Sequence, residues 1–377
     1  MKRIAAIIMS VVLACALVAC GSPKPAPASE SAPASSAAPA KSEEGKFELA
    51  LITDLGTIDD KSFNQGSWEG LKKYAEEHNI THKYYKPTEK STDAYLSAIE
   101  LAVKGGAKAI VTPGFLFEEP VFIAQATYPD VKFILIDGNP HNEDYSEFRT
   151  DSNTVGILYA EEQAGYLAGY AAVKDGMTKL GFIGGMAVPA VVRFGYGYIQ
   201  GADAAAQELG VKVSMNYHYT GGFDATPEAQ TLAASWYQNG TEVIFACGGA
   251  VGNSVMAAAE QAKGKVIGVD VDQSGESATV ITSAMKGLGV SVYDMLKAFY
   301  DGSFPGGQGL VFNAANDGVS LPMASSKFAK FAQADYDALF KKLAANAIDI
   351  TKDTDKNGKT IEITDLKTAA VETTFVG

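Results

Sequence analysis

The sequence predicts an α/β fold with two lobes, each built on a doubly wound parallel sheet. From Phe47 on, short runs that are apolar throughout alternate with longer stretches of helical periodicity. Strands without polar alternation are typical of parallel sheets that carry helices on both faces. The chain of 377 residues is also longer than one ordinary domain, and this rhythm runs through two successive series.

Each series is defined by its apolar strands. In the first series we expect strands at 49–52, 109–111 and 133–136, with helices at 62–79, 93–104 and 121–128. A helix near 155–174 leads into the second series. There we expect strands at 180–183, 211–217, 242–246 and 266–269, with helices at 190–209, 227–239 and 253–263.

The N-terminus lies outside this pattern. Lys2 and Arg3 precede an apolar run at 4–19 that is shorter than the roughly 20 residues needed to cross a bilayer, so residues 1–19 are interpreted as a signal peptide. The run ends in L-V-A-C, which resembles the lipobox of bacterial lipoproteins. We therefore expect cleavage before Cys20 and a lipid anchor on it. An ordinary secretory signal with a chance cysteine is the alternative.

Composition restricts the partners and the cross-links. Residues 20–45 are mainly Ser, Pro, Ala, Lys and Glu, which predicts an extended, disordered tether. The net charge of -13 argues against nucleic acid as a partner, because phosphate binding needs a basic surface. If Cys20 carries lipid, Cys247 has no cysteine to pair with. Cys247 follows an apolar strand and is interpreted as buried filler rather than as a nucleophile.

Aspartates and glycines recur directly after the predicted strands. Asp54, Asp137 and Asp270 follow three of them, and the pairs 184–185 and 248–249, both Gly-Gly, follow two others. In open parallel sheets, ligands bind beyond the carboxyl ends of the strands. One such aspartate is ordinarily a turn or a helix cap, but three in both predicted lobes indicate a shared cleft. There the carboxylates would accept hydrogen bonds, and the glycines would let a ligand approach the backbone.

Aromatic residues stand near the same strand ends. Phe63 opens the first helix, while Phe194 and Phe223 belong to the second predicted lobe. A Phe at a helix start is usually a core residue or a staple, but Phe223 follows two glycines on a loop, where packing explains it less easily. Two rings from separate lobes would hold a flat heterocycle by stacking.

Motifs for catalysis and for metal binding are missing or incomplete. The sequence has no phosphate loop, dinucleotide fingerprint, nucleophile elbow or H-E-x-x-H motif, so we predict no enzyme, no cofactor and no metal. The segment D-T-D-K-N-G at 353–358 matches half of a calcium loop, but its twelfth position is Thr364. The pair Asn357-Gly358 favours a hairpin with a type I′ turn and a strand at 360–363; calcium stays an open alternative.

Two longer motifs carry a family resemblance. They are D-D-K-S-F-N-Q at 59–65 and I-G-V-D-V-D-Q at 267–273, supported by G-G-M at 184–186, R-F at 193–194 and T-S-A-M-K at 282–286. With the lipobox, these segments resemble the basic membrane protein family of lipoproteins. Members are substrate-binding components of ABC importers, and characterised ones bind purine nucleosides. The resemblance runs from about residue 47 to about residue 321, and the tail after about 325 departs from it.

The resemblance implies a type I periplasmic-binding-protein fold whose two lobes are joined by three crossovers. It implies lobe 1 from residues 46–152 plus 281–315, and lobe 2 from 153–280 plus 316–377. It also implies ligand-binding roles. Asp54 and Asn64 would read the base edge, and Phe63 and Phe223 would sandwich the ring with Phe194 nearby. Asp137, Asp270 and Lys286 would hold the ribose, and Gly249 would allow close approach.

The expected function follows from the resemblance. We expect a monomeric, lipid-anchored protein on the extracytoplasmic face of the cell membrane that captures purine nucleosides by hinged closure and delivers them to an ABC permease. Three alternatives remain open at this point: a riboflavin- or sugar-binding lipoprotein of the same fold, an exported nucleoside hydrolase, and a surface antigen or sensor.

Overall fold

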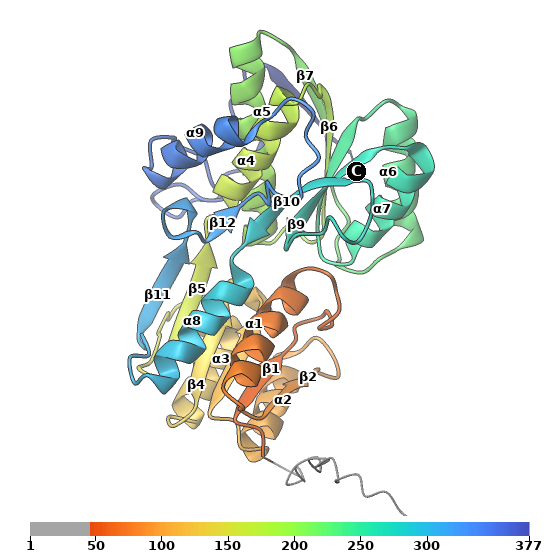
Figure 1. Cartoon of the computed structure of the whole chain (residues 1–377). Coiled ribbons are helices and arrows are strands. Elements are labelled where there is room, and N and C mark those ends of the chain that lie inside the picture. The colour runs from red at the N-terminus through yellow and green to blue at the C-terminus, as the bar shows by residue number, and fades with distance from the viewer. Residues whose placement is uncertain (1–45, 377) are drawn as a thin grey trace, which may run out of the picture. The chain divides into compact units, whose positions relative to one another are not determined.

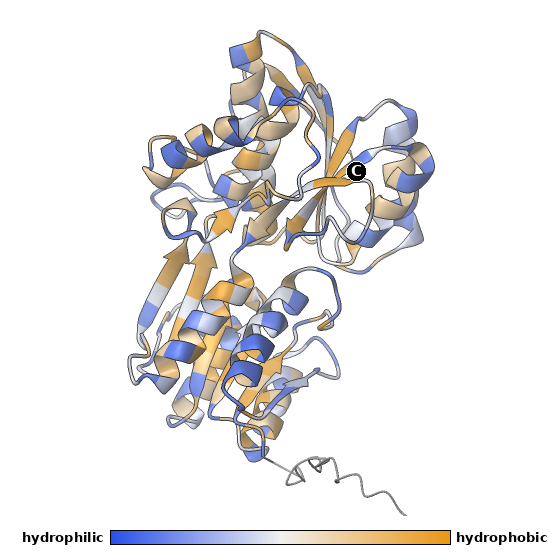
Figure 2. Cartoon of the chain, viewed as in Figure 1, coloured by the Kyte–Doolittle hydropathy of each residue, from blue (hydrophilic) through white to orange (hydrophobic). Residues whose placement is uncertain are grey.

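The computed structural model describes residues 46–376, which contain two separate β-sheets flanked by helices (Figure 1). The predicted signal peptide, Cys20 and the tether lie outside the described residues. The expected α/β fold with parallel sheets is confirmed. Hydrophobic residues concentrate on the strands and on the inward faces of the helices, and polar residues on the outward faces (Figure 2).

The first lobe is built on a six-stranded parallel sheet with strand order β11-β5-β4-β3-β1-β2. Alternate residues of one strand enter different cores: Leu49 and Leu51 pack with helices α1 and α8, whereas Ala50 and Ile52 pack with α2 and α3. Both faces of the sheet are therefore covered, as apolar strands require. The elements are β1 (Leu49–Ile52), α1 (Phe63–Glu77), β2 (His82–Tyr85), α2 (Thr92–Lys104), β3 (Ala109–Pro113), α3 (Glu118–Thr127), β4 (Lys132–Ile136), β5 (Thr154–Tyr159), α8 (Leu288–Tyr300) and β11 (Gln308–Phe312).

The second lobe is built on a seven-stranded sheet with order β12-β10-β9-β8-β6-β7-β13, parallel except for β12. Phe182 and Phe245 face α4 and α5, whereas Ile183 and Ile244 face α6 and α7. The elements are α4 (Glu161–Lys174), β6 (Lys179–Gly184), α5 (Pro189–Leu209), β7 (Val213–Tyr219), α6 (Pro227–Gln238), β8 (Val243–Cys247), α7 (Val251–Ala262), β9 (Lys265–Asp270), β10 (Val280–Lys286), β12 (Val319–Ser320), α9 (Gln333–Ala344) and β13 (Val371–Phe375).

The chain passes between the two sheets three times: after β5, after β10 and after β11. At the first and second crossings, the predicted boundary between the lobes was wrong by one strand. β5 hydrogen-bonds to β4 in the first sheet, so residues 154–159 belong to lobe 1. β10 pairs with β9 in the second sheet, so residues 280–286 belong to lobe 2.

Up to β9, two elements differ from the sequence prediction because their patterns were ambiguous, and the elements from β10 to α9, as well as β13, were not predicted individually. Residues 155–159 were expected to start a helix but form β5, since an apolar run continuous with a helical pattern has no period of its own. Strand β2 was not predicted, because its sequence His-Lys-Tyr-Tyr is half exposed at a sheet edge and lacks an apolar run. No helix within residues 46–376 is long and apolar enough to cross a membrane.

The segment at 353–360 is a hairpin turn, as the sequence favoured. The amide of Asp355 donates to the carbonyl of Lys359 at 2.8 Å, and Thr354 forms a single antiparallel bridge with Thr360. The turn is not type I′: the amide of Gly358 donates to the carbonyl of Asp355 at 3.0 Å, so Lys356 and Asn357 are the central residues, and neither is left-handed. Gly358 follows them with φ of 79°. The strand expected at 360–363 is limited to that bridge, and a 3₁₀ turn follows at Ile363–Asp365.

Candidate ligand-binding site

A cavity of about 500 Å³ lies at the carboxyl ends of the strands of both sheets. That volume is within the range of small-molecule sites, roughly 300–1,000 Å³. Residues from both lobes line it, so the shared cleft that the sequence predicted is present. The lining includes every residue predicted for the site: Asp54, Phe63, Asn64, Asp137, Phe194, Phe223, Gly249, Asp270 and Lys286. Their contacts with a ligand stay a prediction.

One wall of the cavity is the loop between β1 and α1. The Asp54 carboxylate accepts hydrogen bonds at Oδ1 from the amide of Gly56 at 2.8 Å and from Asn64 Nδ2 at 2.9 Å. Asn64 Nδ2 also donates to Asp60 Oδ2 at 2.9 Å. Both N–H groups of the Asn64 amide are thus used within the loop. In this structure Asn64 holds Asp54 through Oδ1, while the side-chain amide of Asn64 has no N–H left for a ligand.

Two aspartates stand at the carboxyl ends of strands: Asp137 directly follows β4, and Asp270 is the last residue of β9. Asp137 has φ of 60° and Asp270 has φ of 66°, so both adopt the left-handed conformation that non-glycine residues rarely take. This backbone conformation turns each carboxylate into the cavity instead of continuing the strand. Burial raises the pKa of Asp270 above its usual value, and Asp270 Oδ2 accepts a hydrogen bond from Ser62 Oγ at 2.6 Å.

Aromatic rings line the cavity from both lobes. Phe63, at the start of α1, comes from lobe 1, and Phe223 comes from the loop after β7 in lobe 2; both are partly exposed. The Phe223 ring lies against Gly185, where an added Cβ would stand 2.5 Å from the ring. Phe194 is 2% exposed and packs edge-on against Phe245, so it is mainly a core residue with one edge at the cavity.

Glycine is required at one position of the loop after β8. Gly249 has φ of 55°, a conformation that a side chain would strain. An added Cβ there would be 3.6 Å from the carbonyl oxygen of Phe223, which is ordinary contact. Backbone conformation, rather than lack of space against the protein, therefore explains this glycine.

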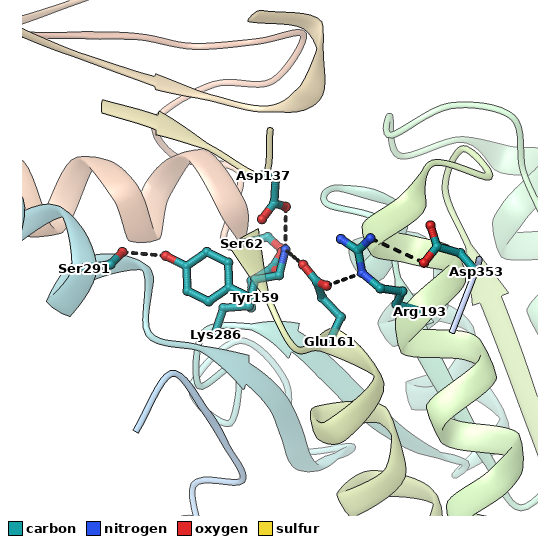
Figure 3. Close-up of polar contacts among 9 residues, drawn as sticks. Ser62, Asp137, Tyr159, Glu161, Arg193, Lys286, Ser291 and Asp353 are labelled. Carbon is teal, nitrogen blue, oxygen red and sulfur yellow. Dashed lines mark hydrogen bonds and ion pairs between the residues drawn. The ribbon is translucent and has the colours of Figure 1, made fainter. Parts of the chain in front are cut away.

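The cavity contains one buried cation, Lys286, at the end of β10 (Figure 3). Its Nζ lies 2.5 Å from Asp137 Oδ2 and 3.0 Å from Glu161 Oε1, and its side chain is 2% exposed. The same ammonium stands 5.1–5.5 Å from the ring centres of Phe63, Tyr159 and Phe194. Burial disfavours the charge, but the surrounding carboxylates outweigh it and raise the pKa of Lys286.

Burial is also the main influence on Asp137. It raises the pKa of Asp137 to about 7; the ammonium of Lys286 opposes this rise, and the carboxylate of Glu161 adds to it. The second oxygen of Asp137, Oδ1, is buried and has no hydrogen-bond partner among the described residues. A carboxylate in this state can accept a hydrogen bond from a hydroxyl or N–H group of a ligand.

Sequence reasoning missed Glu161. This residue starts α4, is completely buried and accepts a hydrogen bond from Arg193 Nε at 2.6 Å. Its neighbour Glu162 is also buried. Both lie inside the helix that was expected at 155–174, so the sequence did not mark them as the first turn of a helix. The pair Arg193-Phe194 was noted as a motif, and it was the only signal in the sequence that pointed to this buried ion pair.

The arrangement suits binding a polar ligand. Three aspartates offer acceptor oxygens, Lys286 offers a donor, and Phe63 and Phe223 offer flat apolar surfaces. Within residues 46–376, no group of three or more His, Cys, Asp or Glu side chains is arranged to hold a metal ion.

Comparison with known proteins gives a family match over most of the chain. The model for the Bmp family, described as ABC transporter substrate-binding protein PnrA-like, matches residues 47–354. The match therefore extends beyond residue 325, where we expected the tail to depart, and it includes α9 and Asp353.

Individual relatives agree with this match. The "ABC transporter nucleoside-binding protein BmpA" of Lactococcus lactis is 31% identical over 297 residues, which cover 73% of this chain and 81% of that protein. The "CD4+ T-cell-stimulating antigen" of Listeria monocytogenes is 29% identical over 343 residues, covering 85% and 90%. "Basic membrane protein A2" of Borrelia garinii is 34% identical over 255 residues, covering 66% and 72%.

Solved structures show the same fold. An ABC transporter solute-binding protein from Aeropyrum pernix has a TM-score of 0.72 at 24% identity, covering 82% of this chain and 95% of that one. A second, from Conexibacter woesei, has a TM-score of 0.66 at 24% identity, covering 81% and 99%. A two-lobed α/β fold, a cavity between its sheets and a family match over 47–354 together place this chain in the Bmp family of ABC transporter substrate-binding proteins.

Proposed function

We propose that this protein captures purine nucleosides outside the cytoplasm and delivers them to the permease of an ABC importer. The observation that carries the proposal is the composition of the cavity. Partly exposed phenylalanines from both lobes and the aspartates Asp54, Asp137 and Asp270 line the same space of about 500 Å³. A nucleoside has a flat heterocycle for the first group and vicinal hydroxyls for the second. A relative that is 31% identical is named as nucleoside-binding, which supports this ligand class.

The polar contacts in the cavity indicate which part of a nucleoside each aspartate would bind. Asp137 Oδ1 lacks a hydrogen-bond partner among the described residues, and Asp270 uses only Oδ2 on Ser62. These two carboxylates are therefore suited to the ribose hydroxyls, with Lys286 beside them. Asp54 also lines the cavity and uses Oδ1 in its hydrogen bonds to Gly56 and Asn64, so its other oxygen would suit an N–H group on the edge of a base.

Capture by closure of the lobes is supported by polar contacts that join the two lobes. Ser62 Oγ donates to Asp270 Oδ2 at 2.6 Å, and Gln273 Nε2 donates to the carbonyl of Lys61 at 2.7 Å. Lys286 pairs with Asp137 across the same boundary. A ligand that adds further contacts to both lobes would shift the population from an open to a closed form.

The anchor in this proposal is Cys20, in the predicted lipobox. One acyl chain alone gives weak, reversible membrane binding, whereas several chains on the same cysteine give stable attachment. The body would then stay at the outer face of the membrane within reach of a permease.

The test is a ligand profile of the purified mature protein. We expect calorimetric titration to give tight binding of adenosine, inosine and guanosine, and weaker or no binding of riboflavin, xylose and free ribose. Small molecules released by denaturing the freshly purified protein should contain a purine nucleoside when analysed by mass spectrometry. Preference for riboflavin or a sugar would refute the proposal, and release of free hypoxanthine from inosine would identify a hydrolase instead.

A further inference from the structure

The cavity lysine belongs to a chain of charges that extends away from the cavity (Figure 3). Lys286 Nζ contacts Asp137 Oδ2 at 2.5 Å and Glu161 Oε1 at 3.0 Å. The other oxygen of Glu161, Oε2, lies 2.6 Å from Arg193 Nε, and Arg193 Nη1 lies 3.5 Å from Asp353 Oδ1. The signs alternate along these five residues, so each buried charge has an opposite neighbour.

The two carboxylates that contact Lys286 belong to different lobes. Asp137 directly follows β4 in lobe 1, whereas Glu161 begins α4 in lobe 2, the lobe that also carries Lys286 on β10. Separation of the lobes would remove Asp137 from Lys286 but not Glu161. Glu161 is therefore the partner that Lys286 keeps whether the lobes are closed or separated.

The helices that carry Glu161 and Arg193 are held unusually close together. Gly165 of α4 and Gly197 of α5 each face the backbone of the other helix, and an added Cβ at either would overlap a carbonyl oxygen. Helices packed at backbone distance leave little freedom at their first turns. Glu161 has no exposed surface, and Arg193 has 14% of its side chain exposed, so the pair is fixed within lobe 2.

We infer that Glu161 is a positioning residue, which holds the Lys286 ammonium at the ligand, and that Arg193 holds Glu161 by engaging its second oxygen. This inference rests on the proposed function, because Lys286 acts through the ligand that it meets. Burial opposes ionisation of Glu161, but the charges of Arg193 and Lys286 outweigh it and lower the pKa of Glu161. The carboxylate therefore remains charged beside Lys286.

The chain offers a matched control at the next residue. Glu162 is 3% exposed and pairs with Lys352 at 3.0 Å, but it makes no ion pair with Lys286. Glu161→Gln and Glu162→Gln each remove one buried charge from the same helical turn and keep the side-chain shape. We expect Glu161→Gln to weaken nucleoside binding roughly 10- to 100-fold, the range of a hydrogen bond to a charged group. Glu162→Gln should leave the affinity unchanged; equal losses in both variants would contradict the inference.

The role of Arg193 is tested by a conservative pair of variants. Arg193→Gln removes the charge next to Glu161, whereas Arg193→Lys keeps it without the planar guanidinium. We expect Arg193→Lys to recover most of the affinity that Arg193→Gln loses. Equal losses in the two variants would show that the charge beside Glu161 is not what matters.

A spectroscopic measurement separates this inference from the ligand assignment. The ¹³Cε resonance of Lys286 in the ligand-free protein, assigned through its loss in Lys286→Arg, should shift in Glu161→Gln and stay in place in Glu162→Gln. An unchanged resonance in Glu161→Gln would refute the positioning role whatever the ligand is. If the wild-type protein binds no nucleoside while this resonance shifts as expected, the proposed function fails and the positioning role stands.

Discussion

Removal of the Phe223 ring tests the aromatic part of the site directly. The ring is partly exposed, lies against Gly185 and belongs to a loop rather than to a helix or strand. Stacking of a base on an aromatic side chain contributes roughly 1–3 kcal/mol. Since about 1.4 kcal/mol corresponds to a tenfold change, Phe223→Ala should weaken nucleoside binding by a factor of roughly 5 to 150. Truncation of a fully buried Phe costs about 3–5 kcal/mol of folding free energy, and this half-buried ring should cost clearly less.

The assay is calorimetric titration with inosine, together with urea unfolding of the ligand-free protein. Phe148→Ala is the matched control, because Phe148 is 62% exposed and does not line the cavity. The control should change neither affinity nor stability. If Phe223→Ala and the equivalent Phe63→Ala both bind inosine as tightly as the wild type, the rings do not hold the base and the ligand argument is refuted.

Three further perturbations have defined outcomes. Burial raises the pKa of Asp270, so its charge costs stability at neutral pH; Asp270→Asn should raise the thermal midpoint and weaken nucleoside binding, and a lower midpoint would contradict this. Burial raises the pKa of Asp137 to about 7 from an unfolded value of about 3.9, so its contribution to stability should be present below about pH 4 and be lost as the pH rises to about 7. In urea unfolding, Asp137→Asn should reduce the fall in stability between those pH values, and an unchanged slope would refute the assignment. Cys20→Ala should release the protein from the membrane fraction into the medium, whereas retention in the membrane would show that another segment anchors it.

The sequence predicted the residues that line the cavity best where the type and position of a residue allow few physical explanations. Aspartates directly after buried strands predicted Asp54, Asp137 and Asp270, because the carboxyl ends of parallel strands meet at one edge of a sheet. All three line the cavity. Phe223 was identified because a large ring after two glycines lacks a packing reason in a loop, and its ring lies at the cavity against Gly185.

The rest depended on contacts between segments that are distant in the chain. Glu161 and Arg193 are 32 residues apart, and only the close packing of α4 on α5 makes them a pair. Asn64 was expected to read the ligand, but its amide bonds to Asp54 and Asp60, a choice among polar partners that the order of residues does not reveal. The lobe boundaries failed for a similar reason, since a strand's sequence does not state which sheet it joins.

Several features of the cavity cost folding free energy in the ligand-free protein. Asp137 and Asp270 adopt left-handed backbone conformations, burial raises the pKa of both, and Asp137 Oδ1 lacks a hydrogen-bond partner among residues 46–376. Each cost is of the kind that a protein retains only where a site needs it. Hydroxyl groups of a neutral ligand would donate to these carboxylates without adding charge, whereas an anionic group would meet a lining with six aspartates and three lysines. Under the proposed function, a neutral, hydroxyl-bearing molecule with a flat ring would therefore offset part of these costs, because its hydroxyl groups would give Asp137 Oδ1 the hydrogen bond that it lacks, and this would favour capture by lobe closure.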